Sequence, residues 1–324
     1  MKTGHGLILA LVAAGILLAA PFIGMECFSP AQLIQDGLPR TIFFDLRLPR
    51  VLTAFLAGGG LALCGLVFQA LFRNPLADPF TLGVASGASF GAAAVILLGL
   101  GGSLLGVPAI SVGAFAGAAV SMLLVHGLAS LKRTATGATL LLAGIAVSFL
   151  FSSLLMFVQY LSSLRDSFHI VRWLMGGIEV FGFGPVLGLL PWVTAGCAVI
   201  ALNLPQLDQL LAGEDLAHSR GVSVRLTKNA LLAATTAVVG AIVAVCGPIG
   251  FVGLMTPHVC KLLWRTSHRL LAPIVFVAGG VFLVVCDTAA RTLVAPAEMP
   301  VGVITALLGG PFFLWILLTA KDSR

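Results

Sequence analysis

The sequence predicts an all-α polytopic membrane protein with about ten transmembrane helices in a single transmembrane domain, residues 1–324. Hydrophobic residues make up 59% of the chain and charged residues only 9%, whereas soluble domains carry about 25% charged residues. The apolar runs are long and continuous, unlike the alternating segments of a transmembrane β-barrel. Because one helical crossing needs roughly 20 residues, the chain has room for about a dozen crossings at most.

Ten apolar stretches are interpreted as crossings. The first, 7–28, could be a signal peptide, but its C-terminal flank makes a poor cleavage region, so we interpret it as a span. The stretch 247–263 is the least regular, since Pro257 and two glycines interrupt it. Residues 162–172 are predicted to be a polar connection and 173–183 an irregular one. The other eight spans are 51–72, 81–100, 110–128, 140–161, 185–204, 229–246, 270–287 and 301–318.

The basic residues predict the orientation of the chain. Ten spans place both termini on one side of the membrane. If that side is the cytoplasm, the 18 Lys and Arg residues divide into 12 inside and 6 outside, in agreement with the positive-inside rule. The net charge of +6 then reports orientation and gives no indication of nucleic-acid binding. The outer set is Arg40, Arg47, Arg50, Arg165, Arg172 and Arg291.

The longest polar segment, 205–228, lies on the cytoplasmic side in this orientation. Pro205 can begin a short amphipathic helix, and Gly213 precedes a second one. The second helix has two acidic residues in its first turn, an arginine in its last turn, and Gly221 where a left-handed C-cap is expected. Such a short, charge-matched helix is typical of a surface that a partner grips, although a solvated loop would have the same composition.

The predicted spans contain few residues that could carry chemistry. Asp287 and Arg291 lie one helical turn apart and are predicted to pair. No G-x-x-x-x-G-K-[ST] stretch is present, so the chain has no P-loop of its own. The six histidines are scattered, and the six cysteines form no C-x-x-C pair and are interpreted as small packing residues. We therefore expect no metal, no cofactor and no catalytic site.

Small residues predict close packing between helices. The candidate faces are Gly58–Gly60, the series Gly83, Gly87 and Gly91, and the pair Gly113 and Gly117. With so few charges inside the spans, a pathway between these helices would be lined by apolar and small polar groups. Such a pathway suits a large, amphipathic or chelated solute better than a bare ion.

Several motifs occur in a fixed order over most of the chain. They are LRLPR at 46–50, QALFRNPLADP at 69–79, LGVASGA at 82–88, LAGIA at 142–146, WLMGG at 173–177, GPIGFVGL at 247–254 with Pro257 and His258, Asp287 with Arg291, PVGVITA at 300–306 and GGPFF at 309–313. Together they resemble the FecCD-type permeases of ATP-driven ABC importers, which carry iron-siderophores, haem and cobalamin.

The resemblance implies a type II ABC importer permease fold and a transport assembly. In that assembly the chain forms a homodimer around a central path in the lipid bilayer of the inner membrane. Two ATP-binding subunits lie below it in the cytoplasm, and a periplasmic substrate-binding protein docks above. The chain itself would move its substrate by alternating access, without an ATPase site of its own.

The resemblance also implies roles for particular residues. In the family, outer arginines contact acidic residues of the binding protein, and the matching positions are Arg47, Arg50 and Arg291. The helix that couples to the ATPase matches, within the cytoplasmic coupling segment 205–228, residues Gly213, Glu214, Asp215, Leu216, Ala217, His218, Ser219, Arg220 and Gly221. The cytoplasmic gate, built from the loops after the second span and before the fifth, matches Asn74, Leu76, Thr136 and Thr139.

Two other classes of protein remain as alternatives. A stand-alone, ion-coupled secondary transporter would also be a polytopic helical protein, but it usually needs a carboxylate or polar cluster near the membrane midplane. An intramembrane enzyme would need a buried acid–base set, which the sequence does not offer. The sequence does not name the substrate, since haem, cobalamin and ferric siderophores share the scaffold.

Overall fold

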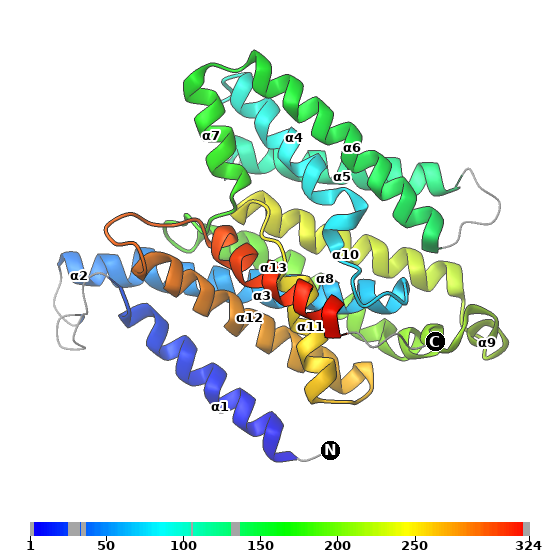
Figure 1. Ribbon diagram of the computed structural model, residues 1–324. Coiled ribbons are helices and arrows are strands. Elements are labelled where there is room, and N and C mark those ends of the chain that lie inside the picture. The colour runs from blue at the N-terminus through cyan, green and yellow to red at the C-terminus, as the bar shows by residue number, and fades with distance from the viewer. Residues whose placement is uncertain (1–2, 25–32, 34–36, 105, 131–136, 320–324) are drawn as a thin grey trace.

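The chain forms a bundle of helices in the computed structural model, which describes residues 3–24, 33, 37–104, 106–130 and 137–319 (Figure 1). Its elements in chain order are α1 (Thr3–Ala19), η1 (Ala20–Phe22), α2 (Leu38–Thr41), η3 (Ile42–Arg47), α3 (Leu48–Leu71), η4 (Pro79–Leu82), α4 (Val84–Leu97), β1 (Ser103–Leu104), β2 (Val107–Pro108), α5 (Ala109–Ser130), α6 (Gly137–Leu161), α7 (Leu164–Leu174), α8 (Gly184–Ala212), α9 (Glu214–Ser219), α10 (Val224–Cys246), α11 (Val252–Leu263), α12 (His268–Thr292) and α13 (Val301–Thr319).

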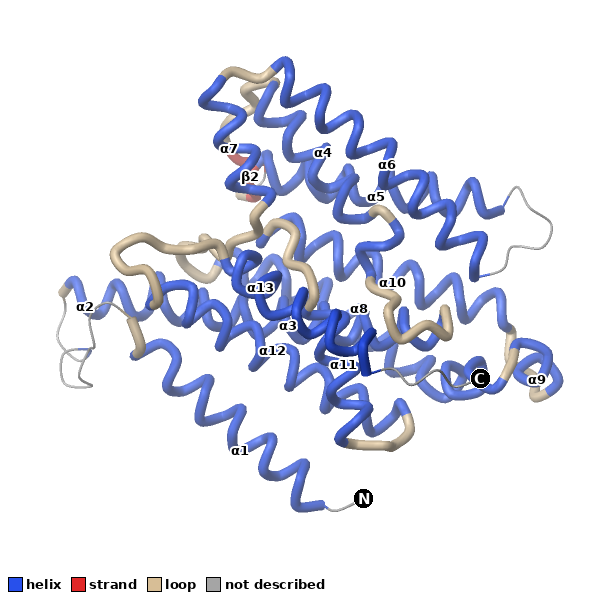
Figure 2. Tube along the Cα trace, viewed as in Figure 1, coloured by secondary structure: helices blue, strands red, loops and turns tan. Residues whose placement is uncertain are grey.

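Most loops lie at two ends of the bundle, which we call the α2 end and the α9 end after the short helices found there (Figures 1 and 2). Helices α3 and α12 run side by side between these ends. In the most apolar stretch of α3, 83% of the residues are buried, compared with 22% in α6. A helix that is apolar on all sides belongs in the interior, so α3 is the central helix and α6 is peripheral.

Six helical segments of the described chain are long and apolar enough to cross a membrane. They are Leu38–Leu71, Ala109–Leu128, Thr139–Leu161, Gly184–Ala212, Val224–Cys246 and His268–Thr292. Shorter apolar helices lie at the remaining predicted spans: Ile8–Phe22, Val84–Leu97, Val252–Leu263 and Val301–Ile316. The all-α membrane fold is thus confirmed, while ten complete crossings stay a prediction.

The least regular predicted span, 247–263, contains only a half-length helix. Residues 247–250 lack regular structure, and α11 begins at Val252 after Phe251, whose φ is 68°. The 12 residues of α11 extend about 18 Å, against a hydrocarbon core of roughly 30 Å. Irregular backbone at membrane depth is tolerated where protein surrounds it, and Ile249 is 1% exposed.

The segment 162–172, predicted to be a polar connection, instead forms the amphipathic helix α7. Ser163 caps this helix by accepting a hydrogen bond from the backbone N–H of Asp166 at 3.2 Å. Ile170 is buried at 1% exposure, whereas Leu164 on the other side is 93% exposed. The sequence carried both signals, a Ser cap and an apolar side, although the prediction took account only of its polarity.

The prediction that Pro205 begins a separate helix is wrong. Helix α8 continues through Pro205 as far as Ala212. Leu204, Leu207 and Leu210 are spaced three residues apart and are 6%, 0% and 2% exposed. This unbroken buried row holds the helix together where the proline removes one backbone donor, because tertiary packing outweighs the local preference.

The predicted small-residue faces are confirmed as close helix contacts. A Cβ atom placed on Gly91 of α4 would lie 2.1 Å from the carbonyl oxygen of Gly113 in α5. Conversely, a Cβ atom on Gly117 of α5 would lie 2.1 Å from the carbonyl oxygen of Gly87 in α4. On α3, a Cβ on Gly58 would lie 2.3 Å from the Gly279 oxygen of α12. Backbones this close leave room only for hydrogen side chains.

Candidate coupling, gate and docking sites

The predicted coupling residues form the short helix α9 at one end of the bundle. Gly213 is its N-cap, and Gly221 follows its C-cap with φ at 84°. The backbone N–H of Gly221 donates to His218 at 2.9 Å, and that of Val222 donates to Ala217 at 3.0 Å. This is the Schellman pattern, in which a glycine takes the left-handed position. The prediction of a second short helix that ends at Gly221 is therefore confirmed.

Helix α9 is attached through one small side chain. Ala217 is fully buried and packs with Leu210 of α8 and Val222, against Leu71 from the end of α3. Leu216 is 42% exposed, an apolar side chain left available to a partner. The other coupling residues are exposed, except Gly213, which is intermediate: Glu214, Asp215, His218, Ser219, Arg220 and Gly221.

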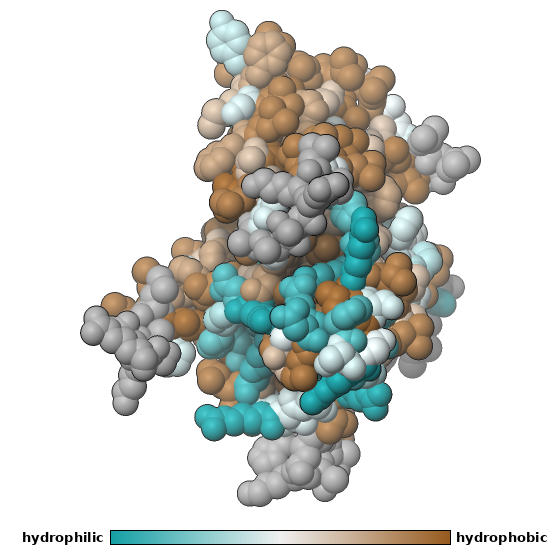
Figure 3. Space-filling view, turned by 90° about the vertical axis from the view of Figure 1, so that its right-hand side faces the viewer, coloured by the Kyte–Doolittle hydropathy of each residue, from teal (hydrophilic) through white to brown (hydrophobic). Residues whose placement is uncertain are grey.

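Figure 3 looks onto the α9 end and shows hydrophilic side chains gathered on it, with hydrophobic ones around them. Glu214 and Lys228 form an ion pair at 2.6 Å that joins α9 to the second turn of α10. The pair is partly exposed, so its contribution to stability is at most about 1 kcal/mol. The α9 end therefore presents a small polar surface above a packed base, the cluster of Leu210, Ala217 and Val222 with Leu71.

The predicted gate residues are close to this base. Asn74 is half-buried, and its Oδ1 accepts a hydrogen bond from the backbone N–H of Leu76 at 2.9 Å. Asp78 caps η4 by accepting from the backbone N–H of Phe80 at 3.0 Å. Burial raises the pKa of Asp78 to about 6, because it disfavours the charged carboxylate.

The second predicted gate segment approaches the first. A Cβ on Gly137, the first residue of α6, would lie 3.4 Å from the ring of Phe72, so the start of α6 adjoins the loop after α3. Thr139 is half-buried in the first turn of α6. Thr136 lies outside the described residues. The described start of α6 therefore lies beside the end of α3, where the other predicted gate segment begins.

Helix α3 ends just before the predicted gate residue Asn74, and its last turn closes in an unusual way. Arg73 has φ at 47°, a left-handed conformation that costs a non-glycine residue roughly 1–2 kcal/mol. Its guanidinium Nη2 donates to the carbonyl oxygen of Leu210 in the last turn of α8, at 2.8 Å. A cation at the C-terminal end of a helix is favourable because it meets the negative end of the helix dipole.

A partly buried polar contact that sequence reasoning missed lies at the same end. Oδ1 of Asp208 on α8 accepts from the backbone N–H of His268 at 3.3 Å and lies 2.5 Å from His268 Nδ1. The helix's own N-cap, Ser267, makes no side-chain cap. Asp208 therefore caps α12 from another helix, a role that no local pattern around either residue indicates.

At the α2 end, three ionisable side chains from α3 and α12 meet. Arg50 Nε lies 3.0 Å from Asp287 Oδ1, and Arg291 Nε lies 3.2 Å from Asp287 Oδ2. Arg50 Nη1 also bonds Glu298 at 2.7 Å. Asp287 is 1% exposed, Arg291 7% and Arg50 14%. The predicted Asp287–Arg291 pair is confirmed, and Arg50 joins it from a position 237 residues away.

The three predicted docking arginines lie together at the α2 end, but mainly below its surface. Arg47 is 9% exposed, and its Nη1 donates to the carbonyl oxygens of Pro21 and Phe22 at 3.3 and 3.4 Å. Arg47 thus connects η3 to η1, while Arg50 and Arg291 connect α3 and α12 through Asp287. Their contact with a binding protein stays a prediction.

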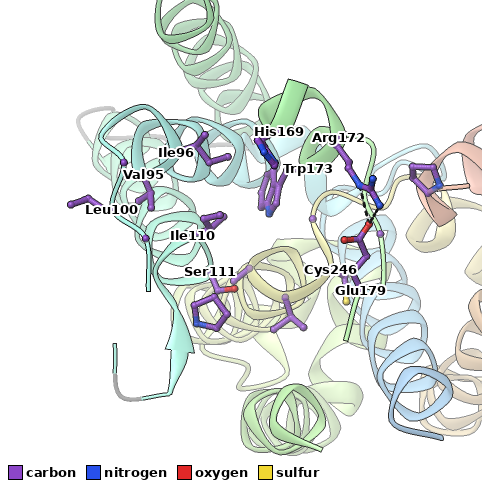
Figure 4. Close-up of a pocket in the computed structure, with 18 residues that line it drawn as sticks. Val95, Ile96, Leu100, Ile110, Ser111, His169, Arg172, Trp173, Glu179 and Cys246 are labelled. Atoms are coloured by element: carbon purple, nitrogen blue, oxygen red, sulfur yellow. Dashed lines mark hydrogen bonds and ion pairs between the residues drawn. The ribbon is translucent and has the colours of Figure 1, made fainter. Parts of the chain in front are cut away.

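A cavity of about 470 Å³ opens at the α2 end among α4, α5, α7 and the loop after α10 (Figure 4). His169 and Trp173 extend toward it from α7, and apolar side chains of α4 and α5 form the opposite wall. At its rim, Arg172 Nη2 bonds Glu179 Oε1 at 2.7 Å, which raises the pKa of the arginine. Among the described residues, no group of three or more His, Cys, Asp and Glu side chains could hold a metal ion.

A buried central helix, close glycine contacts between helices and, in the described chain, six helices long enough to cross a membrane are the features of a multi-pass membrane protein. Residues 7–319 match the FecCD transport family. The chain is 42% identical over 326 residues to the vitamin B12 import system permease protein BtuC of Serratia proteamaculans, covering 99% of this chain and 94% of that protein. It is 40% identical over 286 residues to the hemin transport system permease protein HmuU of Yersinia pestis, covering 87% and 85%.

The fold agrees with a solved structure of a metal-chelate type ABC transporter in an inward-facing conformation. The TM-score is 0.84 at 30% identity, covering 96% of this chain and 97% of the other. The chain therefore belongs to the FecCD transport family. It is a permease subunit of an ABC importer. Permeases of this class work with a substrate-binding protein and with ATP-binding subunits, and the ATP-binding subunits hydrolyse the ATP.

Proposed function

We propose that this chain imports a metal chelate of the cobalamin, haem or iron-siderophore class as a homodimer in the bacterial inner membrane. The observation that carries the proposal is the family match over 7–319, together with relatives of about 40% identity named for vitamin B12 and hemin. The few charges inside the bundle and its small-residue contacts suit a large chelated solute.

In this proposal the α9 end faces the cytoplasm and receives the force of the ATPase. Closure of the ATP-binding subunits pushes α9, which is short, exposed and rooted through Ala217 in the cluster of Leu210, Val222 and Leu71. A push on such a packed base is transmitted to α8 and to the end of α3, where Asn74 and Leu76 form the gate. Alternating access then follows as a shift between two packed states.

A crosslinking experiment tests the coupling role of α9. Leu216→Cys, at an exposed position of α9, is expected to crosslink to the ATP-binding subunit in a nucleotide-dependent way. Leu164→Cys is the matched control, since Leu164 is 93% exposed but lies on α7 at the opposite end. Absence of a crosslink at position 216 under every nucleotide condition would contradict the proposal, as would uptake driven by an ion gradient without the ATPase.

We further propose that the α2 end docks the substrate-binding protein through Arg47, Arg50 and Arg291. Glu298, with a side chain 54% exposed, pairs with Arg50 Nη1 on the solvent side. An acidic residue of the binding protein would have to compete with Glu298 for this nitrogen. Glu298→Gln removes this competitor and leaves Asp287 paired. We expect the dissociation constant for the binding protein to fall about three- to tenfold, or roughly 1 kcal/mol.

Titration of the purified permease with binding protein measures this change. The matched control is Glu179→Gln, which releases another half-exposed partner of an arginine at the same end, Arg172. An unchanged affinity in Glu298→Gln would place docking away from Arg50. An equal gain of affinity in both variants would show that the effect comes from the change in net charge and not from Arg50.

A further inference from the structure

Two helices at the α9 end stop with the same hydrogen-bond pattern but with different residues in the left-handed position. At the end of α9, Gly221 takes that position, as helices usually require. At the end of α3, the backbone N–H of Arg73 donates to Ala70 at 3.3 Å and that of Asn74 to Gln69 at 3.2 Å. These two bonds make a Schellman motif in which Arg73 stands where glycine is preferred.

A residue held in an unfavourable backbone conformation calls for a role for its side chain. The backbone at position 73 needs only to turn, and glycine would turn it without strain. The guanidinium, however, donates to the carbonyl oxygen of Leu210 at 2.8 Å. That oxygen belongs to the last turn of α8 and is shared with the backbone N–H of Gly213, at 3.2 Å. Arg73 therefore bonds the turn that leads directly into α9.

The position of Arg73 relative to both functional segments is specific. Along the chain, Arg73 is the residue immediately before Asn74, so its backbone sets the start of the gate loop. Across the bundle, Leu210 packs in one cluster with Ala217 of α9, and Leu71 packs against that cluster. Leu71 and Arg73 thus hold the α8–α9 corner by an apolar contact and a charge-assisted hydrogen bond.

We propose that Arg73 is a positioning residue that transmits movement of the coupling helix to the gate loop through its bond to Leu210. This inference rests on the proposed coupling and gate roles. When α9 and the end of α8 move, a bond to the α8 carbonyl draws the left-handed residue with it, and the gate loop that begins at Asn74 follows. Without the bond, α8 can move while the loop stays in place.

Arg73→Gly separates the two roles of this residue. Glycine adopts the positive φ without strain, so the helix end is preserved while the link to Leu210 is lost. In proteoliposomes with the ATP-binding subunits and the binding protein, we expect assembly and ATP hydrolysis to stay within about twofold of the unchanged protein. Substrate uptake per ATP hydrolysed is expected to fall at least about tenfold.

Three further variants make the result decisive. Arg73→Asn also tolerates a positive φ and should reproduce the loss. Arg73→Lys keeps a cationic donor on a long side chain and should restore part of the uptake. Arg265→Gly removes an exposed cation from the loop after α11, at the same end, and should leave uptake per ATP unchanged.

Unchanged uptake per ATP in Arg73→Gly would overturn the inference and leave Arg73 as a helix terminator alone. Parallel loss of assembly, hydrolysis and uptake would overturn it as well, since that result would show a purely structural role. The proposed function fails separately, if the unchanged protein shows no ATP-dependent uptake or if position 216 does not crosslink.

Discussion

Asp287→Ala is expected to prevent the permease from folding. The carboxylate is 1% exposed and lies between the guanidinium groups of Arg50 and Arg291, which are 14% and 7% exposed. Its removal takes the paired carboxylate from buried Arg291 and leaves Arg50 with only the partly exposed Glu298. Breaking a buried pair in this way costs about 3–5 kcal/mol, and the repulsion between the two arginines adds to it. The measurement is thermal unfolding and recovery of monodisperse protein in detergent.

The control for this variant is Glu298→Ala. Glu298 bonds the same Arg50 but is 54% exposed, so its loss should cost about 1 kcal/mol or less. Both variants remove a carboxylate partner of Arg50, so the difference between their losses of stability measures the effect of burying that partner. Normal yield and an unchanged unfolding temperature in Asp287→Ala would show that the two arginines need no buried counter-ion.

Gly65→Ala is expected to destabilise the packing of α3 against α11. A Cβ at position 65 would fall well inside the contact distance of the Gly253 carbonyl oxygen, at 1.8 Å. The obstacle is backbone, so no side-chain rotation can relieve it, and the two helices must separate. We expect a loss of about 3 kcal/mol, at the upper end of the usual cost of overpacking, measured by denaturant or thermal unfolding in detergent.

Gly188→Ala is the matched control on another helix. No heavy atom lies within 4 Å of a Cβ at Gly188, on an exposed part of α8. Alanine in place of glycine within a helix gains up to about 1 kcal/mol of helix propensity. Equal effects of the two substitutions would mean that the close approach of α3 and α11 plays no part in stability.

Hydropathy was sufficient to predict most of the fold, because apolar length is the dominant constraint on a membrane helix. It was insufficient for α11, where helical and irregular backbone share one apolar stretch. It also failed at Pro205, because the buried row of leucines on α8 is a tertiary feature. Small-residue spacing predicted the α4–α5 contact correctly, since Gly87 and Gly91 share one face of their helix.

The site was predictable only where its signals are local. The α9 helix followed from acidic residues after Gly213 and from Gly221 at its end, and the Asp287–Arg291 pair followed from helical spacing. Arg50 and Asp208, in contrast, find their partners at separations of 237 and 60 residues. Nothing in the sequence near either residue marks such a contact. For the same reason the burial of the three outer arginines was not foreseen.

The separation between Arg50 and Asp287 also sets an order of events during biosynthesis. Translation at about 5–20 residues per second completes Arg50 roughly 10–50 s before Asp287 is made, given the 237 residues between them. Through that interval the arginine has no partner carboxylate from α12 and must stay in contact with water or lipid head groups. The α3–α12 core therefore closes only after most of the polypeptide has left the ribosome.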